Sequence, residues 1–210
     1  MMKMKTIVYV DAFNLYYGAL KGTPHKWLDL IALCRVMIPT SDVIGIKYFT
    51  AKVHPRNDDQ GQPVRQQMYL RALKTIPNLQ LIYGHYLSHV VWMPLANPEL
   101  GRKPFAQVVK TDEKGSDVNL ASHLLLDAFD GAFDCAVIIS GDSDLKTPVQ
   151  FVANRFKKIV GVLNPQKNAC KALQSTATFY KHIRSSAVES SQFPALMSDE
   201  QGLFHKPETW

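Results

Sequence analysis

The sequence predicts an α/β fold in which helices cover both faces of a doubly wound sheet of about five mainly parallel strands. Strand-like and helix-like segments alternate along almost the whole chain, which is the pattern of a parallel sheet. The first strand-like run, residues 6–10, shows no polar alternation, as expected of a strand that is buried on both faces. Connections of helix length between successive strands favour right-handed crossovers, which produce a doubly wound sheet.

The strands are predicted in five segments, and one proline-rich stretch between them resists assignment. The strand segments are residues 6–10, 43–50, 79–87, 134–140 and 159–163. Residues 90–109 contain three prolines and a glycine, which exclude a long helix and favour a loop or a small hairpin.

The helices are expected between and after these strands, with prolines marking two of their ends. One begins near Asn14, and the next covers residues 28–37 at helical apolar spacing before Pro39 stops it. After a polar loop over residues 52–63, a proline suits the first turn of a helix over residues 63–76. The remaining helices are predicted at residues 116–129, 148–156 and 172–183.

The composition predicts one folded domain over residues 1–184 and a loosely ordered tail over residues 185–210. The chain is 46% hydrophobic and 20% charged, which supplies enough apolar side chain for a sizeable core. From residue 185 onward, Ser, Gln, Pro and Glu become frequent, as in loosely held termini.

The apolar run at residues 7–10 is too short for a signal peptide or a membrane span, so we expect a cytoplasmic protein without membrane contact. The three cysteines, Cys34, Cys135 and Cys170, are far apart and form no Cys-x-x-Cys pair. Reduced thiols are therefore expected, rather than a disulfide framework or a zinc site.

Acidic residues stand at the carboxyl ends of two predicted strands. Asp11 directly follows the first strand, Asp142 and Asp144 follow the fourth, and Asp117 opens the helix that leads into the fourth. Ligands of doubly wound sheets bind beyond the carboxyl ends of the strands. We therefore expect these four aspartates to gather at one edge of the sheet.

The helix that starts at residue 116 is expected to turn Asp117 toward the sheet and away from solvent. At a period of 3.6 residues, the face below Asp117 is apolar and should pack on the core. That face consists of Leu120, Ala121, Leu124, Leu125 and Ala128, whereas Asn119, Ser122, His123 and Asp130 occupy the opposite face.

Converging carboxylates repel one another and raise one another's pKa unless a cation compensates. A hard divalent cation prefers oxygen ligands, and Mg²⁺ typically takes one or two carboxylates directly and keeps several waters. Such a metal activates water and neutralises charge on phosphate, which suits phosphodiester hydrolysis. For any one aspartate alone, a turn or a helix cap is the better interpretation, and Asp144 is the weakest candidate of the four because it could cap the helix that follows. Only the convergence of four favours a catalytic metal site.

Three further residues beside the aspartates are supporting candidates, each with a plainer alternative. Asn14 suits a hydrogen bond to a ligand or water, and equally a helix cap. Ser140 suits the positioning of a water, and equally a satisfied hydroxyl. Lys114 suits a contact with phosphate, although lone loop lysines are usually solvated. We interpret Asp112, Glu113 and Asp127 as surface charges, and the seven histidines show no metal-binding spacing.

Three ordered motifs carry a resemblance to a known family. They are VDAFNL at residues 10–15, KGSDVNLA at residues 114–121 and ISGDSD at residues 139–144. Together they resemble the NYN domain family of PIN-like nucleases, in particular its LabA-like bacterial branch, over about residues 5–184. The resemblance implies a PIN-like sheet with central strand order 3-2-1-4-5, Mg²⁺ or Mn²⁺ as cofactor, and cleavage of RNA.

The same resemblance assigns roles to the acidic residues. It implies that Asp11, Asp117 and Asp142 bind the metal, with Asp144, Asn14 and Ser140 as their neighbours. The chain departs from many relatives in two places, where His123 replaces an Asp and Leu145 replaces a Phe. We expect a small effect from His123, because the helical period places it off the core face.

An acidic pocket needs flanking cations before it can hold the RNA backbone. The net charge is +6, and gathering the acidic residues in one place would leave the remaining surface more basic. Tyr16, Tyr17 and Trp92 suit stacking on the bases of single-stranded RNA, although packing is an equal alternative for the two tyrosines. The candidate backbone contacts are Arg65, Arg71, Arg102, Lys103, Lys110, Lys167 and Lys171.

Two other functions remain open from the sequence. A regulatory protein of the same fold would bind RNA or a partner without cutting, although an idle acidic cluster would cost stability. A HAD-type phosphatase needs a second aspartate two residues after its nucleophile, whereas Asp11 is followed by Ala12 and Phe13. A homodimer is compatible with the sequence, which contains no heptad pattern that decides it.

Overall fold

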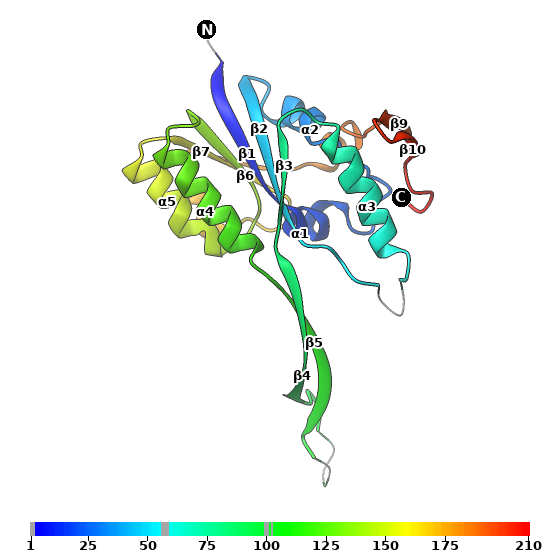
Figure 1. Cartoon of the computed structure of the whole chain (residues 1–210). Coiled ribbons are helices and arrows are strands. Elements are labelled where there is room, and N and C mark those ends of the chain that lie inside the picture. The colour runs from blue at the N-terminus through cyan, green and yellow to red at the C-terminus, as the bar shows by residue number, and fades with distance from the viewer. Residues whose placement is uncertain (1–2, 56–58, 99–100, 102) are drawn as a thin grey trace.

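The structure is a computed structural model that describes residues 3–55, 59–98, 101 and 103–210, and its centre is one parallel sheet of six strands (Figure 1). The strand order is β3-β2-β1-β6-β7-β8, and every pair is parallel. The α/β fold and the central order of the first five strands are thus confirmed, and a sixth strand is added at one edge. The strands are β1 (Met4–Asp11), β2 (Ser41–Thr50), β3 (Leu79–Tyr83), β6 (Cys135–Ile139), β7 (Ile159–Asn164) and β8 (Phe179–His182).

Helices cover both faces of this sheet, as the sequence predicts. One face carries α4 (Ser116–Phe129), α5 (Lys146–Gln150) and the π-helical turn η3 (Phe151–Arg155). The other face carries the shorter elements at the N-terminal side together with α3 and the C-terminal helix (Figure 1). These are α1 (Ala12–Leu15), the π-helical turn η1 (Tyr16–Leu20), α2 (Leu30–Met37), α3 (Gln62–Lys74) and α7 (Ser185–Glu189).

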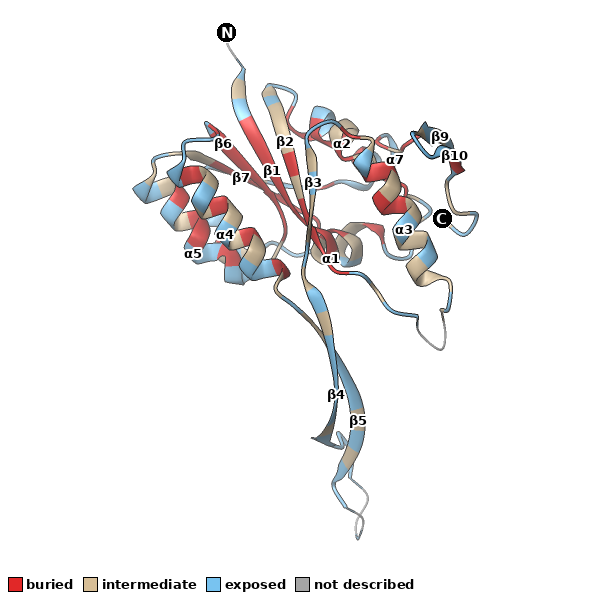
Figure 2. Cartoon of the chain, viewed as in Figure 1, coloured by how far each residue is buried: buried red, intermediate tan, exposed pale blue. Residues whose placement is uncertain are grey.

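Alternate residues of β1 build the two hydrophobic cores, one on each face. Ile7 and Tyr9 pack under α4, whereas Val8 and Val10 pack with α2 and α3 on the other side. All four are buried, which explains why the strand shows no polar alternation. Figure 2 shows the same pattern as a red centre of the sheet between helices that are half red and half pale blue.

The predicted helix over residues 172–183 is wrong beyond Gln174. Only α6 (Lys171–Gln174) is helical, and the chain then forms edge strand β8. The physical reason is tertiary: the ring of Phe179 fills the space beside Gly161, where a Cβ would come within 2.0 Å of it. Gly161 therefore admits Phe179 as its partner on the neighbouring strand.

A part-buried polar cluster under α4 corrects two expectations about that helix. Asp127 accepts hydrogen bonds from Lys47 Nζ at 2.6 Å and from the hydroxyl of Tyr9 at 2.6 Å. His123 Nδ1 lies 3.3 Å from the same Nζ, and its ring packs against Phe49. Asp127 is therefore not a free surface charge, and His123 contacts the sheet. A sequence pattern cannot foresee the charge partner on β2.

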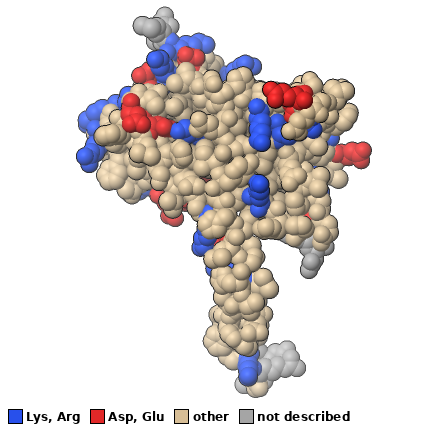
Figure 3. All heavy atoms as spheres, in the orientation of Figure 1, with Lys and Arg blue, Asp and Glu red and all other residues tan. Residues whose placement is uncertain are grey.

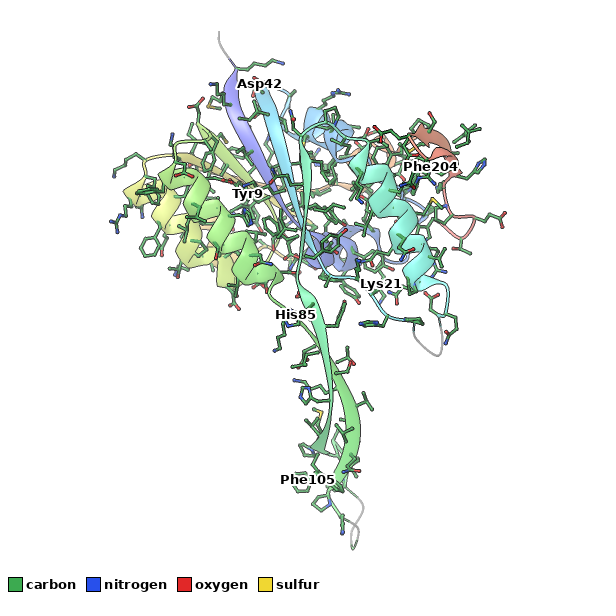
Figure 4. The ribbon with its side chains drawn as sticks, in the orientation of Figure 1. Tyr9, Lys21, Asp42, His85, Phe105 and Phe204 are labelled. Atoms are coloured by element: carbon green, nitrogen blue, oxygen red, sulfur yellow. The ribbon has the colours of Figure 1, made fainter. Side chains whose placement is uncertain are left out.

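The predicted third strand ends early, and a long antiparallel arm leaves the body instead. β3 stops at Tyr83, and β4 (His85–Pro94) pairs with β5 (Phe105–Lys114) over ten registered pairs. Gly84 permits the break, because a Cβ there would come within 2.5 Å of the Lys114 carbonyl. Figure 4 places His85 at the base of the arm and Phe105 at its far end.

The arm is exposed along most of its length, which Figure 2 shows in pale blue. In the view of Figure 3 its surface is mostly uncharged, with basic side chains near its base and its tip. Several large apolar side chains are exposed on it, including Val90, Trp92, Phe105 and Val109. The small hairpin that the prolines favoured is thus present and longer than expected.

The C-terminal segment packs onto the body, which differs from the loosely ordered tail that its composition predicts. Phe193 and Phe204 are buried against the ring of Trp27, and Trp210 lies 6.3 Å from it between centroids. Trp27 Nε1 donates to the carbonyl of Pro194 at 2.9 Å. After α7, the segment forms a hairpin of β9 (Leu196–Asp199) and β10 (Gly202–His205) beside α3, where Figure 4 labels Phe204. A few aromatic anchors outweigh a polar composition here.

Within the described ranges, no helix combines the length and the apolar character that a membrane crossing requires.

Candidate metal centre

Asp11 occupies the carboxyl end of β1 and is buried, with an exposed fraction of 5%. Its Oδ1 accepts a hydrogen bond from the backbone N–H of Asn14 at 2.9 Å, so Asp11 caps α1. Its Oδ2 accepts a hydrogen bond from the hydroxyl of Ser140 at 2.9 Å. Both carboxylate oxygens are therefore fixed, while each retains room for a second interaction.

Ser140 links Asp11 to Asp142. The Ser140 hydroxyl donates to Asp11 and accepts from the backbone N–H of Asp142 at 3.0 Å. Asp142 Oδ1 in turn accepts from the N–H of Asp144 at 2.9 Å and caps the turn η2 (Ser143–Leu145). The sequence offers a satisfied hydroxyl or a water-positioning role for Ser140, and the structure shows the satisfied hydroxyl in a connecting position.

Asn14 connects the carboxyl ends of β6 and β7 by hydrogen bonds to Gly141 and Gln166, and the sequence did not predict a role for Gln166. Its Oδ1 accepts from the N–H of Gly141 at 2.9 Å and from Gln166 Nε2 at 2.9 Å. Gln166 is held by Asn164, whose Oδ1 accepts the Gln166 N–H at 2.9 Å. Asn164 is fully buried at the carboxyl end of β7. A polar residue at the end of a predicted strand was the only feature of the sequence that could have indicated this part of the site.

Asp117 stands in the first turn of α4, but it is an exposed residue and not turned away from solvent as the helical period predicted. The buried residue of that turn is Ser116, whose N–H and hydroxyl both donate to Glu113 Oε1, at 3.2 and 2.8 Å. Glu113 is therefore a helix cap beside the acidic residues and not a free surface charge.

The carboxylates lie close enough to raise one another's pKa, so they form one electrostatic cluster. The pKa of Asp11 is raised to about 6, chiefly by burial; the charges of Asp117 and Asp142 add to this increase, and the hydrogen bonds from Asn14 and Ser140 oppose it. Although Asp117 is exposed, partial loss of water around its carboxyl raises its pKa, and the nearby carboxylates raise it further. Those carboxylates belong to Asp142, Glu113 and Asp144. The cluster thus carries repulsion that a cation would relieve.

The oxygen ligands of this cluster suit a hard divalent cation, but the number of side chains that can bind it directly is limited. Every candidate ligand is an oxygen, and oxygen is what Mg²⁺ and Mn²⁺ prefer. Among the described residues, however, no three acidic, His or Cys side chains are arranged closely enough to hold an ion together. The cluster therefore fits a cation that takes one or two carboxylates directly and reaches the others through water.

Removal of the Ser140 hydroxyl is expected to raise the pKa of Asp11 above its wild-type value of about 6. The hydroxyl donates to ionised Asp11, and this donation favours the charged form. In metal-free Ser140→Ala protein, the carboxyl carbon of Asp11 should titrate at higher pH by ¹³C NMR. The matched control is Ser190→Ala, whose hydroxyl donates to the Ala187 carbonyl instead. An unchanged Asp11 titration would contradict the role assigned to this hydrogen bond.

The arginine and lysine residues that are predicted to bind the RNA backbone lie in different environments. Arg71 donates to both oxygens of Asp199, at 2.7 and 2.6 Å, and therefore fastens the C-terminal hairpin to α3. Its predicted role in substrate binding is not supported. Arg65 pairs with Asp59, and Lys110 pairs with Asp112 at 2.9 Å on the arm. Lys103, Lys114, Lys167 and Lys171 are exposed, as is the paired Lys110, and Arg102 lies outside the described residues.

An aromatic cavity of about 380 Å³ adjoins Asp11 on the α3 side of the sheet. Ala12 and Phe13, which follow Asp11, form part of its wall together with the end of β2, α3 and the C-terminal residue Trp210. Tyr16 and Tyr17 both line it. A larger hollow of about 920 Å³ lies between α2, β8 and α7, but its described lining carries no carboxylate. The smaller cavity is linked to the acidic cluster through Ala12 and Phe13, the two residues that follow Asp11, although none of the four clustered aspartates is in its described lining.

Comparison with known proteins supports the assignment of the fold and adds one named relative. The model of the NYN domain matches residues 5–184. A curated protein of Pseudomonas putida, 6-hydroxy-3-succinoylpyridine 3-monooxygenase HspA, is 30% identical over 236 aligned positions, covering 99% of this chain and 75% of its own. A crystal structure from Vibrio parahaemolyticus, the protein VPA0982 of unknown function, matches with a TM-score of 0.57 at 17% identity. It covers 91% of this chain and 97% of its own and shows a common fold alone. The chain belongs to the NYN domain family.

Proposed function

We propose that this chain is a divalent-metal-dependent ribonuclease that hydrolyses phosphodiester bonds in single-stranded RNA. The observation that supports the proposal most is the buried Asp11 carboxylate, whose pKa is raised to about 6 beside two other aspartates. Perturbed carboxylates at the carboxyl edge of a parallel sheet are typical of catalytic sites. Membership of the NYN domain family, whose typical members are nucleases that use a divalent metal, points to the same chemistry.

In the proposed site, one group of residues would bind the cation and another group would hold the surrounding loops in place. Asp11, Asp117 and Asp142 would hold Mg²⁺ or Mn²⁺, with Asp144 as the outer carboxylate. When bound, the cation would lower the pKa of a water and neutralise charge on the phosphate. Ser140, Asn14 and Gln166 hold the loops after β1, β6 and β7 in one arrangement. Exposed Lys167 and Lys171 follow β7 and suit the RNA backbone, and Lys114 precedes the Asp117 helix.

The test is cleavage of a labelled single-stranded RNA in Mg²⁺ or Mn²⁺ by wild type and Asp142→Asn. Cleavage by the variant should fall to background, because Asn keeps the shape of the cap but removes the charge that binds the cation. Asp130→Asn is the matched control, since this exposed aspartate ends the same helix that Asp117 begins. Equal cleavage by wild type and Asp142→Asn would refute the proposal. RNA that is bound but never cut would instead support a regulatory NYN protein.

A second candidate function follows from the aromatic cavity and from the name of the Pseudomonas putida relative. That relative is named as a 3-monooxygenase of 6-hydroxy-3-succinoylpyridine, and a cavity of about 380 Å³ lined by aromatic rings suits a pyridine ring. The test is to titrate the protein with 6-hydroxy-3-succinoylpyridine by calorimetry and to follow O₂ consumption with a reduced nicotinamide as electron donor. Binding together with O₂ uptake, in a protein that leaves RNA intact, would favour this function.

A further inference from the structure

We propose that the aromatic cavity beside Asp11 holds one unpaired nucleobase of the RNA, adjacent to the phosphate at the acidic cluster. This inference rests on the ribonuclease function proposed above and adds to it a base-binding subsite. The subsite consists of rings for stacking and one polar atom for recognition, and both are present in the cavity wall.

The rings of the wall provide surfaces for stacking. Tyr16 and Tyr17 pack edge to face at 5.3 Å between centroids, and Lys21 Nζ lies 4.9 Å from the centroid of Tyr17. Tyr69 and Trp210, which also line the cavity, lie 5.8 Å apart between ring centroids. Tyr17 is half exposed, so its ring is accessible at the cavity. Aromatic platforms of this kind bind the bases of single strands.

The polar atom is the side-chain oxygen of Gln62. Its Oε1 is buried in the cavity wall and accepts no hydrogen bond from any residue that the structure describes. Its neighbour Gln66 is fully used, because it donates to the Ala51 carbonyl at 2.9 Å and accepts from the Val53 N–H at 3.0 Å. A buried acceptor without a partner is costly, and the N–H groups at the edge of a base would supply the partner.

The position of the cavity suits a nucleotide of a strand that continues into the acidic cluster. Ala12 and Phe13 link the wall directly to Asp11, and Tyr48 lines the cavity from the strand that pairs with β1. Lys26 also lies in the wall and offers positive charge to a phosphate, whereas the charge of Arg65 in the same wall is paired with Asp59. A volume of about 380 Å³ accommodates one nucleoside and excludes a base pair, which is consistent with single-stranded RNA.

The experiment separates binding from cleavage by using the Asp142→Asn protein in EDTA. AMP, GMP, CMP and UMP are titrated by calorimetry, and labelled single-stranded hexanucleotides by fluorescence anisotropy. Tyr17→Ala should weaken hexanucleotide binding about tenfold, and Tyr17→Phe should restore it, because the ring carries the stacking. Gln62→Leu should make the affinities for the four bases more equal. Phe151→Ala, an exposed ring on the other face of the sheet, should change neither property.

The outcomes distinguish this inference from the ribonuclease proposal. Equal binding of all nucleotides by wild type, Tyr17→Ala and Gln62→Leu would overturn the subsite, even where the wild type cuts RNA normally. Binding that depends on Tyr17 and Gln62, in a protein that cuts no RNA, would support the subsite alone. Binding of 6-hydroxy-3-succinoylpyridine in the cavity with no binding of nucleotides would overturn it in favour of a small aromatic ligand. Thermal unfolding of each variant checks that Tyr17→Ala remains folded, and where it does not, Gln62→Leu keeps the test decisive through the relative affinities of the four nucleotides.

Discussion

The Asp11→Asn variant is expected to lose RNA cleavage by about a thousandfold and at the same time to gain stability without metal. The loss follows because Asp11 is the most buried carboxylate of the cluster and its charge contributes to cation binding in the proposed site. Asparagine preserves an oxygen that accepts the Asn14 N–H, so the cap of α1 is retained. Initial cleavage rates of a labelled single-stranded RNA in saturating Mg²⁺ measure this half of the prediction.

The gain in stability follows from the raised pKa of Asp11. A carboxyl whose folded-state pKa lies above its unfolded value makes the fold less stable once it ionises. The cost is absent below the unfolded pKa of 3.8, grows as the pH rises through that value, and is complete above about pH 6. A shift of this size corresponds to about 3 kcal/mol at neutral pH. Chemical unfolding in EDTA should therefore show equal stability of the two proteins near pH 4 and a more stable variant at pH 7.

Added Mg²⁺ should reduce or reverse the difference in unfolding free energy between Asp11→Asn and wild type at pH 7. A cation that binds the folded wild type stabilises it by mass action, whereas the variant has lost one of the charges that bind it. The matched control is Asp134→Asn, because Asp134 lies at the opposite, N-terminal end of β6 and accepts the N–H of Lys5. A variant of Asp11 that is less stable than wild type at pH 7 in EDTA would show that the carboxylate serves the fold instead of the site.

Local patterns in the sequence were sufficient to predict the sheet and the acidic edge. The strands β1, β6 and β7 are mainly apolar runs that end at or just before a polar residue, and α4 matches its predicted bounds of residues 116–129. The positions of Asp11 and Asp142 follow from those strand ends, because parallel strands place their carboxyl ends along one edge. The hydrophobic pattern of the strands and the position of their ends are therefore enough to predict that these distant carboxylates lie at one edge of the sheet.

The features that the sequence did not reveal depend on contacts between distant segments. Gln166 looks like an ordinary loop residue, and only the position of Asn14 across the sheet edge gives it a function. Gly18 has a similar dependence, since a Cβ there would meet the Pro165 carbonyl at 2.9 Å and push the loop after β7 away from η1. Glu113 and Asp127 had the appearance of surface charges because their partners, Ser116 and Lys47, are not evident from composition.

The C-terminal segment shows most clearly how a few side chains decide whether a polar sequence is ordered. Trp27 is fully buried, and four other aromatic rings surround it, three of which come from residues beyond 184. Arg71 adds a bidentate pair with Asp199 and stacks on Phe204 at 4.3 Å. The segment also supplies Trp210 to the aromatic cavity. Its order is therefore linked to the site as well as to the core.

The Trp27→Ala variant is accordingly expected to lose about 3 to 5 kcal/mol of unfolding free energy. The substitution removes a fully buried indole, leaves a void among the rings and frees the carbonyl of Pro194 from its hydrogen bond. Urea unfolding followed by circular dichroism measures the loss, and hydrogen exchange should show faster exchange at the amide of Phe193, which donates to the Trp27 carbonyl.

The matched control is Trp92→Ala, because this indole is 61% exposed on the arm and its removal should change stability by about 0.5 kcal/mol or less. Equal losses in the two variants would show that the C-terminal segment does not depend on Trp27. A loss confined to Trp27→Ala, together with weaker nucleotide binding, would show that the segment beyond residue 184 stabilises the domain and shapes the cavity beside Asp11. The polar composition of residues 185–210 would then be explained as the solvent side of a packed segment.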